Sequence, residues 1–165
     1  IPKSYFDKGR TQFHYQAANP DEEAFVVAAS CLGYQLIPPR TSTTLTLDIQ
    51  GEPQTVQIVG INEFNSNRKR MSIVVREHGK EGAMLYCKGA DSAMLERLAP
   101  NQNEQIAKVR RHINEFAVKG LRTMVLARRR LDQSEYESFS KRYNDARSSL
   151  LQREERLEKG AEDFE

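Results

Sequence analysis

The sequence predicts an α+β fold, an antiparallel β-sheet flanked by helices. Two observations support this prediction: most segments with strand character lie between residues 34 and 87, and helical patterns lie before and after them. Strands grouped in this way, without regular strand–helix–strand alternation, favour an antiparallel sheet with packed helices over a doubly wound nucleotide fold. The length of 165 residues suits one domain with a single sizeable core.

The first expected helix begins at Asn19-Pro20 and ends near Gly33. Asn19 is a favourable N-cap, and Pro20 is tolerated in the first turn. The acidic residues at 21–23 lie at the positive end of the helix dipole. Residues 1–12 show no clear period and are expected to form a flexible lead-in, so we assign residues 13–165 to the domain itself.

Five strands are expected next, because β-branched and aromatic residues recur with a period of two. They span residues 34–37, 43–48, 55–61, 71–76 and 83–87. Pro38-Pro39 and residues 50–53 separate the first three strands. The turn at residues 78–82 predicts that the last two strands form an antiparallel hairpin.

Helical patterns return after Gly89. Asp91 is expected to cap a short helix that continues to Leu98. A longer helix has Gly120 just beyond its end, a common helix stop. Its apolar positions recur every three or four residues: Ile106, Val109, Ile113 and Phe116.

The last part of the chain is expected to contain one strand and two helices. Residues 121–127 read as a short buried strand, which Arg128-Arg129-Arg130 ends as a solvated turn. Asp132 and Glu135 form a D-x-x-E capping box at the start of the next helix. Residues 150–165 are expected to form a charged, truncated helix.

Composition and charge exclude several function classes. Residues 1–131 carry 19 basic and 13 acidic side chains, whereas residues 132–165 carry 6 and 10. A moderately basic body suggests an anionic ligand, but the net charge of +2 is small for a nucleic-acid binder. No apolar run approaches the roughly 18–20 residues of a membrane span, and Cys31 and Cys87 match no metal or redox spacing. We expect a soluble, cytosolic segment with reduced thiols.

Standard catalytic and nucleotide motifs are absent from the sequence, including the Walker A loop, G-x-G-x-x-G, G-x-S-x-G and H-E-x-x-H. His14, His78 and His112 share no spacing typical of metal ligands, and we predict no metal site. What remains are three short segments in which polar residues interrupt regular elements.

The first segment spans residues 63–71. Phe64 followed by small polar residues and a cationic run could stack a base and approach phosphates. Taken alone, however, the segment favours a charged loop with Phe64 packed into the core. In the second segment, Lys88-Gly89-Ala90-Asp91, a lysine ends a strand and a glycine permits close backbone approach. This arrangement suits an anion site or an ordinary strand-to-helix turn.

The third segment is Gly120-Leu121-Arg122-Thr123. Arg122 opens an otherwise apolar stretch, and its guanidinium must face solvent or an anion because burying it unpaired would be too costly. Glu22 is a weaker candidate, since completing a capping box with Asn19 is a sufficient structural role for it.

Together and in order, these segments carry a family resemblance. Residues 15–22 (YQAANPDE), residues 64–72 (FNSNRKRMS), the KGAD tetrapeptide at 88–91 and the GLRT tetrapeptide at 120–123 resemble the nucleotide-binding domain of a P-type ATPase. The KGAD form and the N-P-D-E opening are similar to the type-IV subfamily, the phospholipid flippases. The resemblance extends from about Gln12 to about Leu157.

The resemblance implies roles for seven residues. Phe64 stacks on adenine, Lys88 lies at the base of the adenine pocket, and Glu22 accepts from the exocyclic amino group or contacts a nearby polar group. Lys69 and Arg122 reach towards the ribose and phosphates, with Ser66 and Thr123 as candidate hydroxyl contacts. Ion pumps commonly have arginine where Ser66 stands, which implies a weaker phosphate contact from this loop.

The resemblance also implies the context of the domain. The ligand would be ATP with Mg²⁺ carried on its phosphates, and the partners would be the phosphorylation and actuator domains of a longer chain. The D-K-T-G motif that carries the phosphorylated aspartate is absent here. We therefore expect a monomeric fragment that binds ATP without hydrolysing it. Its parent would be an ATP-driven phospholipid translocase, with this domain on the cytosolic face of a plasma, Golgi or endosomal membrane and without direct membrane contact.

Two alternatives belong to other classes. A non-enzymatic α+β protein-interaction module would bind a partner through the charged helices after Asp132. RNA binding through residues 68–70 and 128–130 would require a steep salt dependence, and the acidic C-terminal part of the chain disfavours it.

Overall fold

A computed structural model describes residues 15, 17, 19–38, 41–149, 156–157, 159–160 and 163–165. The chain divides into two compact units, residues 1–57 and residues 58–165. A six-stranded antiparallel sheet has the strand order β1-β2-β3-β4-β5-β6, in which β3 contributes residues to both units. The α+β prediction is therefore confirmed. The expected lead-in at residues 1–12 lies outside the described residues.

The first unit contains α1 (Pro20–Cys31), β1 (Tyr34–Ile37) and β2 (Thr44–Ile49). The Asn19 side chain accepts a hydrogen bond from the backbone N–H of Glu22 at 3.0 Å, which confirms Asn19 as the N-cap. After the helix, Gly33 adopts a φ of 89°, a conformation that glycine adopts without steric cost. β1 and β2 pair antiparallel, with Tyr34 opposite Ile49.

β3 (Glu52–Asn65) begins three residues earlier than predicted. Gln50 and Gly51 have φ values of 57° and 101°, and together they form a two-residue hairpin turn with positive φ at both positions. The Asp48 carboxylate accepts the backbone N–H of Gly51 at 2.6 Å and stabilises this turn. Since two residues suffice for the turn, Pro53 falls within the strand, opposite Asp48.

The second unit contains the rest of β3, then β4 (Arg70–Glu77), β5 (Ala83–Gly89) and β6 (Val125–Leu131). β4 and β5 form the predicted antiparallel hairpin, and β6 pairs antiparallel with β5. The unit also contains α2 (Asp91–Met94), the 3₁₀ helix η2 (Leu95–Arg97), α3 (Asn103–Val118) and α4 (Gln133–Ser148).

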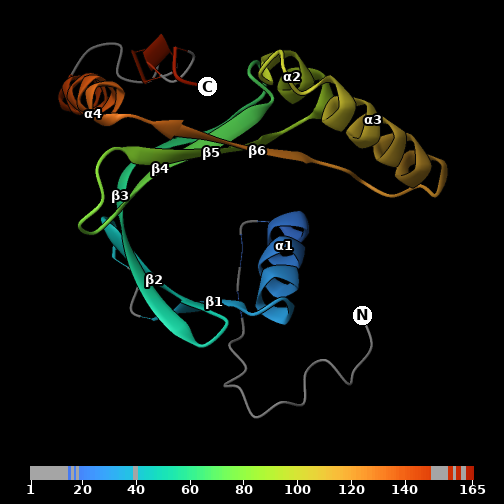
Figure 1. Cartoon of the computed structure of the whole chain (residues 1–165), viewed down its shortest axis with the longest axis horizontal. Coiled ribbons are helices and arrows are strands. Elements are labelled where there is room, and N and C mark those ends of the chain that lie inside the picture. The colour runs from blue at the N-terminus through green and yellow to red at the C-terminus, as the bar shows by residue number, and fades with distance from the viewer. Residues whose placement is uncertain are drawn as a thin grey trace. The chain divides into compact units, whose positions relative to one another are not determined.

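Helices cover one face of strands β4–β6. Figure 1 shows α4 and the pair α2–α3 on the same side of these strands. The core lies on that face, where Phe139 of α4 is 2% exposed and stacks on Tyr143. The other buried members of this core come from the strands, α2 and the C-terminal segment: Val74, Ala83, Leu85, Cys87, Met94, Val125, Leu131 and Phe164.

Two local predictions were wrong. The last strand covers Val125–Leu131 instead of residues 121–127, so Arg128-Arg129-Arg130 lie inside it and do not form a turn. Arg129 belongs to the covered face, where it pairs with Glu135 and donates to the Phe164 carbonyl at 3.2 Å. Asp91 is the first residue of α2, and the N-cap position belongs to Ala90.

α4 begins with the predicted capping box. The Asp132 carboxylate accepts the Glu135 N–H at 2.8 Å, and the Glu135 carboxylate accepts the Asp132 N–H at 3.0 Å. Farther along α4, the Tyr143 hydroxyl bonds both the N–H and the C=O of Ile61 in β3, each at 3.2 Å. The expected helix at 150–165 lies largely outside the described residues, although residues 156–157 and 159–160 are helical.

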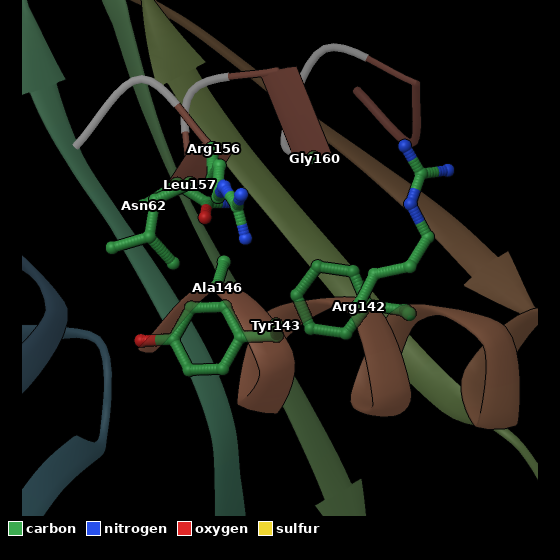
Figure 2. Close-up of a pocket in the computed structure, with 8 residues that line it drawn as sticks. Asn62, Arg142, Tyr143, Ala146, Arg156, Leu157 and Gly160 are labelled. Carbon is green, nitrogen blue, oxygen red and sulfur yellow. The ribbon is translucent and has the colours of Figure 1, made fainter. Parts of the chain in front are cut away.

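Figure 2 shows a small cavity between α4 and the segment around residues 156–160. Asn62, Tyr143 and Arg156 are among its lining residues. Its volume of about 10 Å³ matches a single water molecule at most. None of the predicted site residues lines it, so this cavity is not a candidate ligand site.

Candidate functional site

Four strand ends of the second unit meet at one edge of the sheet. β3 ends at Asn65, β4 begins at Arg70, β5 ends at Gly89 and β6 begins at Val125. Arg70 lies opposite Gly89, and Gly89 lies opposite Val125, so these three residues form one row across the sheet. We call the last two residues of these strands at this end, together with the connecting segments beside them, the strand-end edge. It carries six of the seven predicted site residues: Phe64, Ser66, Lys69, Lys88, Arg122 and Thr123.

Phe64 is the penultimate residue of β3 and is 62% exposed. The alternative in which its ring packs into the core is therefore wrong. An aromatic ring that is exposed in this way is accessible for stacking by a planar ligand. The turn that follows contains Ser66 and Lys69, both exposed.

Lys69 has a φ of 54°, which is uncommon for a residue with a side chain. Its N–H donates to the Asn65 carbonyl at 2.7 Å, and its carbonyl accepts the Ala90 N–H at 3.0 Å. These two bonds tie the β3–β4 turn to the β5–α2 turn. The unusual backbone at Lys69 is thus held by hydrogen bonds on both sides.

Lys88 lies on β5 in the second row of the sheet, opposite Met71 of β4 and Leu126 of β6. Because side chains alternate between the two faces of a strand, Lys88 and Tyr86 share the face opposite to that of the buried Cys87. Tyr86 and Leu126 are both exposed. The face opposite to the core therefore combines cationic, aromatic and aliphatic groups beside Lys88.

Gly89 allows the strand-end edge to be compact. A Cβ at this position would lie 2.6 Å from the Lys69 carbonyl oxygen and 2.6 Å from the Arg70 Cβ. No side chain fits there without moving the Lys69–Arg70 backbone. The close approach predicted from the Lys88-Gly89 pair is present, and its partner is the neighbouring turn.

Arg122 and Thr123 precede β6 by a few residues and were expected within a strand. Both residues lie in the connection between α3 and β6, where Arg122 is exposed and Thr123 is half-buried. The connection enters the sheet at Val125, beside Gly89. Arg122 and Thr123 therefore lie at the same edge as Lys88.

Glu22 belongs to the first unit, on α1, where its backbone N–H is held by Asn19. The structure thus brings six predicted residues to one edge of the second unit and places the seventh on a helix of the first unit.

Sequence patterns did not reveal a buried ionic cluster on the covered face. Arg68 and Arg70 both pair with Glu165, and the three side chains are between 0% and 4% exposed. Ser72 joins them through a hydrogen bond to the same carboxylate. The alternation of polar residues at 68, 70 and 72, in step with the buried Val74, was the available signal. Burial of Arg68 and Arg70 removes two of the cations that the RNA-binding alternative named, whereas Lys69 and the arginines at 128–130 are exposed.

Cys87 lies next to this cluster, opposite Ser72 in the register. Burial raises the pKa of its thiol from 9.0 to about 11, and the negative charge of Glu165 acts in the same direction. Both cysteines are free, with Cys31 half-buried. At neutral pH the Cys87 thiol is protonated and acts as a small core residue.

The donor set at the strand-end edge suits a nucleotide. An exposed aromatic ring can stack a base, and ammonium and guanidinium groups can bind phosphates. Among the described residues, no group of three or more His, Cys, Asp or Glu side chains is arranged to hold a metal ion. No helix within the described ranges is long and apolar enough to cross a membrane.

Comparisons with a protein-family model and with known proteins all point to the P-type ATPases. The family described as P-type ATPase, cytoplasmic domain N, matches residues 3–160. The chain is 42% identical over 149 residues to "Phospholipid-transporting ATPase DRS2" of Saccharomyces cerevisiae, covering 89% of this chain and 11% of that protein. It is 41% identical over 156 residues to "Probable phospholipid-transporting ATPase 12" of Arabidopsis thaliana, covering 91% and 13%. It is also 41% identical over 152 residues to "Phospholipid-transporting ATPase ID" of Mus musculus, covering 92% and 12%.

These alignments include nearly the whole of this chain but only 11–13% of the relatives' length. The family match spans both compact units and includes all seven predicted site residues. The chain therefore belongs to the P-type ATPase cytoplasmic domain N family, and the relatives compared above are phospholipid-transporting ATPases by name.

Proposed function

We propose that this domain binds ATP at the strand-end edge, with the adenine on Phe64 and the phosphates directed towards the cationic side chains. The observation that carries the proposal is the 62% exposure of Phe64 at the same edge as Lys69, Lys88 and Arg122. An aromatic face beside separated cations matches a ligand that has a planar base at one end and negative charge at the other.

Each residue has a role that its position supports. Lys88 and Gly89 form the end of β5, where the small glycine lets the Lys69–Arg70 backbone pack closely beside Lys88. Lys69 and Arg122 supply charge for the ribose–phosphate part, and the hydroxyls of Ser66 and Thr123 can donate hydrogen bonds. The contact between Glu22 and the adenine amino group rests on the family resemblance alone, since Glu22 belongs to the first unit. Mg²⁺ would arrive on the phosphates, where it neutralises charge.

The proposed task of the domain is to position ATP, while another domain carries out the chemistry. Holding the γ-phosphate in line with a nucleophile converts an encounter into an intramolecular step, which is worth several kcal/mol of barrier. A surface site with one aromatic stack binds modestly, since base stacking contributes about 1–3 kcal/mol. Modest affinity suits a domain that must also release ADP.

In the longer protein, the γ-phosphate would be delivered to an aspartate of a phosphorylation domain, with an actuator domain completing the cycle. The similarity to phospholipid-transporting ATPases supports phospholipid translocation as the activity that ATP drives. The domain would work at the cytosolic face of a eukaryotic membrane without contacting the lipid itself.

Calorimetric titration of the 165-residue chain with Mg-ATP tests the proposal. Wild-type protein should bind ATP, and Phe64→Ala should bind it about 5- to 150-fold more weakly through loss of the stack. Because Phe64 is exposed, its replacement should change the free energy of unfolding by less than about 0.5 kcal/mol.

Phe116→Ala is the matched control, because it removes a 43%-exposed phenylalanine of α3 in the same unit. It should bind Mg-ATP like the wild type. The proposal fails if wild-type protein shows no binding at millimolar Mg-ATP, or if Phe64→Ala binds as tightly as Phe116→Ala. Binding of a protein partner through the helices after Asp132, unaffected by nucleotide, would instead favour the interaction-module alternative.

A further inference from the structure

A single buried carboxylate joins the two arginines that flank Lys69. Glu165 Oε2 lies 2.5 Å from Arg70 Nε, and Glu165 Oε1 lies 3.1 Å from Arg68 Nη1. The Ser72 hydroxyl donates to Glu165 Oε1 at 2.6 Å and accepts from the Asn62 amide at 2.9 Å. The Glu165 side chain is fully buried, so water does not screen these interactions.

The cluster spans both strands of the β3–β4 hairpin. Arg68 Nη2 donates to the Glu63 carbonyl of β3 at 2.9 Å, and Arg70 Nη1 donates to the Arg68 carbonyl at 3.1 Å. Within the described part of the chain, Arg68 Nε and Arg70 Nη2 are buried without a hydrogen-bond partner. Two guanidiniums thus share one carboxylate, and removing that charge would leave buried cations uncompensated.

The cluster is connected to the strand-end edge by the backbone between the two arginines. Lys69 lies there with a φ of 54°, bonded to Asn65 on one side and to Ala90 on the other. Gly89 packs directly against the Lys69–Arg70 backbone, as the 2.6 Å approach of a Cβ at Gly89 indicates. A shift of either arginine must therefore move Lys69, and with it the end of β5 that carries Lys88.

We propose that Glu165 is a positioning residue. From the covered face it fixes the β3–β4 turn, so that Lys69 and Lys88 are preorganised for nucleotide binding at the strand-end edge. This inference rests on the function proposed above. It assigns a role to a residue 95 positions after Arg70, in a segment that carries none of the predicted site residues.

Glu165 is held in place by its neighbours independently of the arginine pair. Phe164 is buried edge-to-face against Phe139, with ring centroids 5.3 Å apart. The Phe164 carbonyl accepts from Arg129, and Asp163 pairs with Arg142. Neutralising Glu165 should therefore loosen the hairpin turn and leave the docked segment in place.

Glu165→Gln in the 165-residue chain tests the inference, with Asp163→Asn as the matched control. Both variants change one carboxylate of the same segment to an amide, but Asp163 is 52% exposed in its pair with Arg142. Two quantities are measured for each variant: the dissociation constant for Mg-ATP, and amide hydrogen exchange at Lys69 and Ala90 without nucleotide.

Glu165→Gln should speed exchange at the Lys69 and Ala90 amides about tenfold or more by raising the population of the locally open turn. It should weaken Mg-ATP binding about 2- to 30-fold, the range found for residues that act on a ligand without touching it. Asp163→Asn should leave both quantities as in the wild type. Unchanged exchange and affinity in Glu165→Gln would overturn the inference.

Glu165→Asp keeps the comparison valid if Glu165→Gln does not fold. It retains the charge but withdraws it by one methylene, so both effects should lie between those of Glu165→Gln and the wild type. Glu165→Asp behaving like Asp163→Asn would also overturn the inference. If wild-type protein binds no Mg-ATP, the proposed function is wrong, and with it the effect of Glu165 on nucleotide binding. The exchange rates still decide whether Glu165 holds the β3–β4 turn.

Discussion

Replacing Gly89 by alanine tests the packing on which the strand-end edge depends. The added Cβ would lie 2.6 Å from the Lys69 carbonyl oxygen, 2.6 Å from the Arg70 Cβ and 2.9 Å from the Arg70 Cα. These atoms belong to the backbone or are attached directly to it, so no side-chain rotation relieves the clash. The β3–β4 turn and the end of β5 must separate by several tenths of an ångström.

The expected cost follows from two opposing terms. Overpacking of this kind destabilises by about 1–3 kcal/mol, and the upper half of that range applies because the obstruction is backbone. Alanine also lowers the conformational entropy of the unfolded chain, which stabilises the folded protein by about 0.4–1 kcal/mol. Gly89→Ala should therefore lower the free energy of unfolding by about 1–2.5 kcal/mol. For a chain of this size, each kcal/mol corresponds to a fall in Tm of roughly 2–4 °C.

Urea and thermal unfolding followed by circular dichroism measure this loss. Gly160→Ala is the control, because nothing lies within 4 Å of a Cβ built at that helical position. It should be neutral or stabilising by up to about 1 kcal/mol through helix propensity. A loss below about 0.5 kcal/mol in Gly89→Ala, or equal behaviour of the two variants, would refute the packing described at this edge.

Three further predictions concern the fold of the second unit. Asp132→Ala removes the capping box of α4 and should lower the free energy of unfolding by about 0.5–2 kcal/mol in urea titrations; no change would mean that the box does not stabilise the helix. Phe139→Ala empties the centre of the core and should cost about 3–5 kcal/mol in the same assay, and a cost below about 1 kcal/mol would contradict its burial. The Cys87 thiol has a pKa of about 11 in the folded state and near 9.0 in the unfolded state, so the free energy of unfolding should fall as pH rises between these values. In a labelling experiment with iodoacetamide at about pH 8, followed by mass spectrometry, Cys31 should react before Cys87. Faster labelling of Cys87 would contradict the raised pKa.

Local signals in the sequence predicted most of the fold. The N-cap at Asn19, the β4–β5 hairpin and the capping box at Asp132 are each specified by a few adjacent residues, and the structure contains all three. The start of β3 was missed because Pro53 resembles a strand breaker, although a two-residue turn at Gln50-Gly51 lets the strand begin before it.

The predicted bounds of β6 are wrong because the apolar run at residues 121–127 overlaps only the first part of the strand. The strand continues through Arg128-Arg129-Arg130. All three arginines are exposed, and Arg129, on the covered face, also pairs with Glu135. Charged residues are compatible with a strand when alternation places them in solvent or beside a partner. The partner here comes from α4, so local sequence alone could not reveal it.

The individual residues of the candidate site could be predicted from the sequence, but the strand pairing and the buried ionic cluster that hold them together could not. Phe64, Lys88 and Arg122 lie where elements end, and such positions are visible in local sequence. Their convergence depends on strand pairing, which places Arg70, Gly89 and Val125 in one row. The ionic cluster joins Arg68 to Glu165 across 97 positions, and no local pattern encodes a contact of that range.

The central claim is that the strand-end edge binds ATP, and amide chemical shifts test it most directly. In a titration of the isotope-labelled chain with Mg-ATP, the amides of Phe64, Lys88 and Arg122 should shift together and saturate with one dissociation constant. Amides of the exposed turn at Gln50-Gly51 should stay unchanged as an internal reference. Absence of shifts at Phe64, Lys88 and Arg122 at millimolar Mg-ATP, or shifts confined to other parts of the chain, would contradict the account.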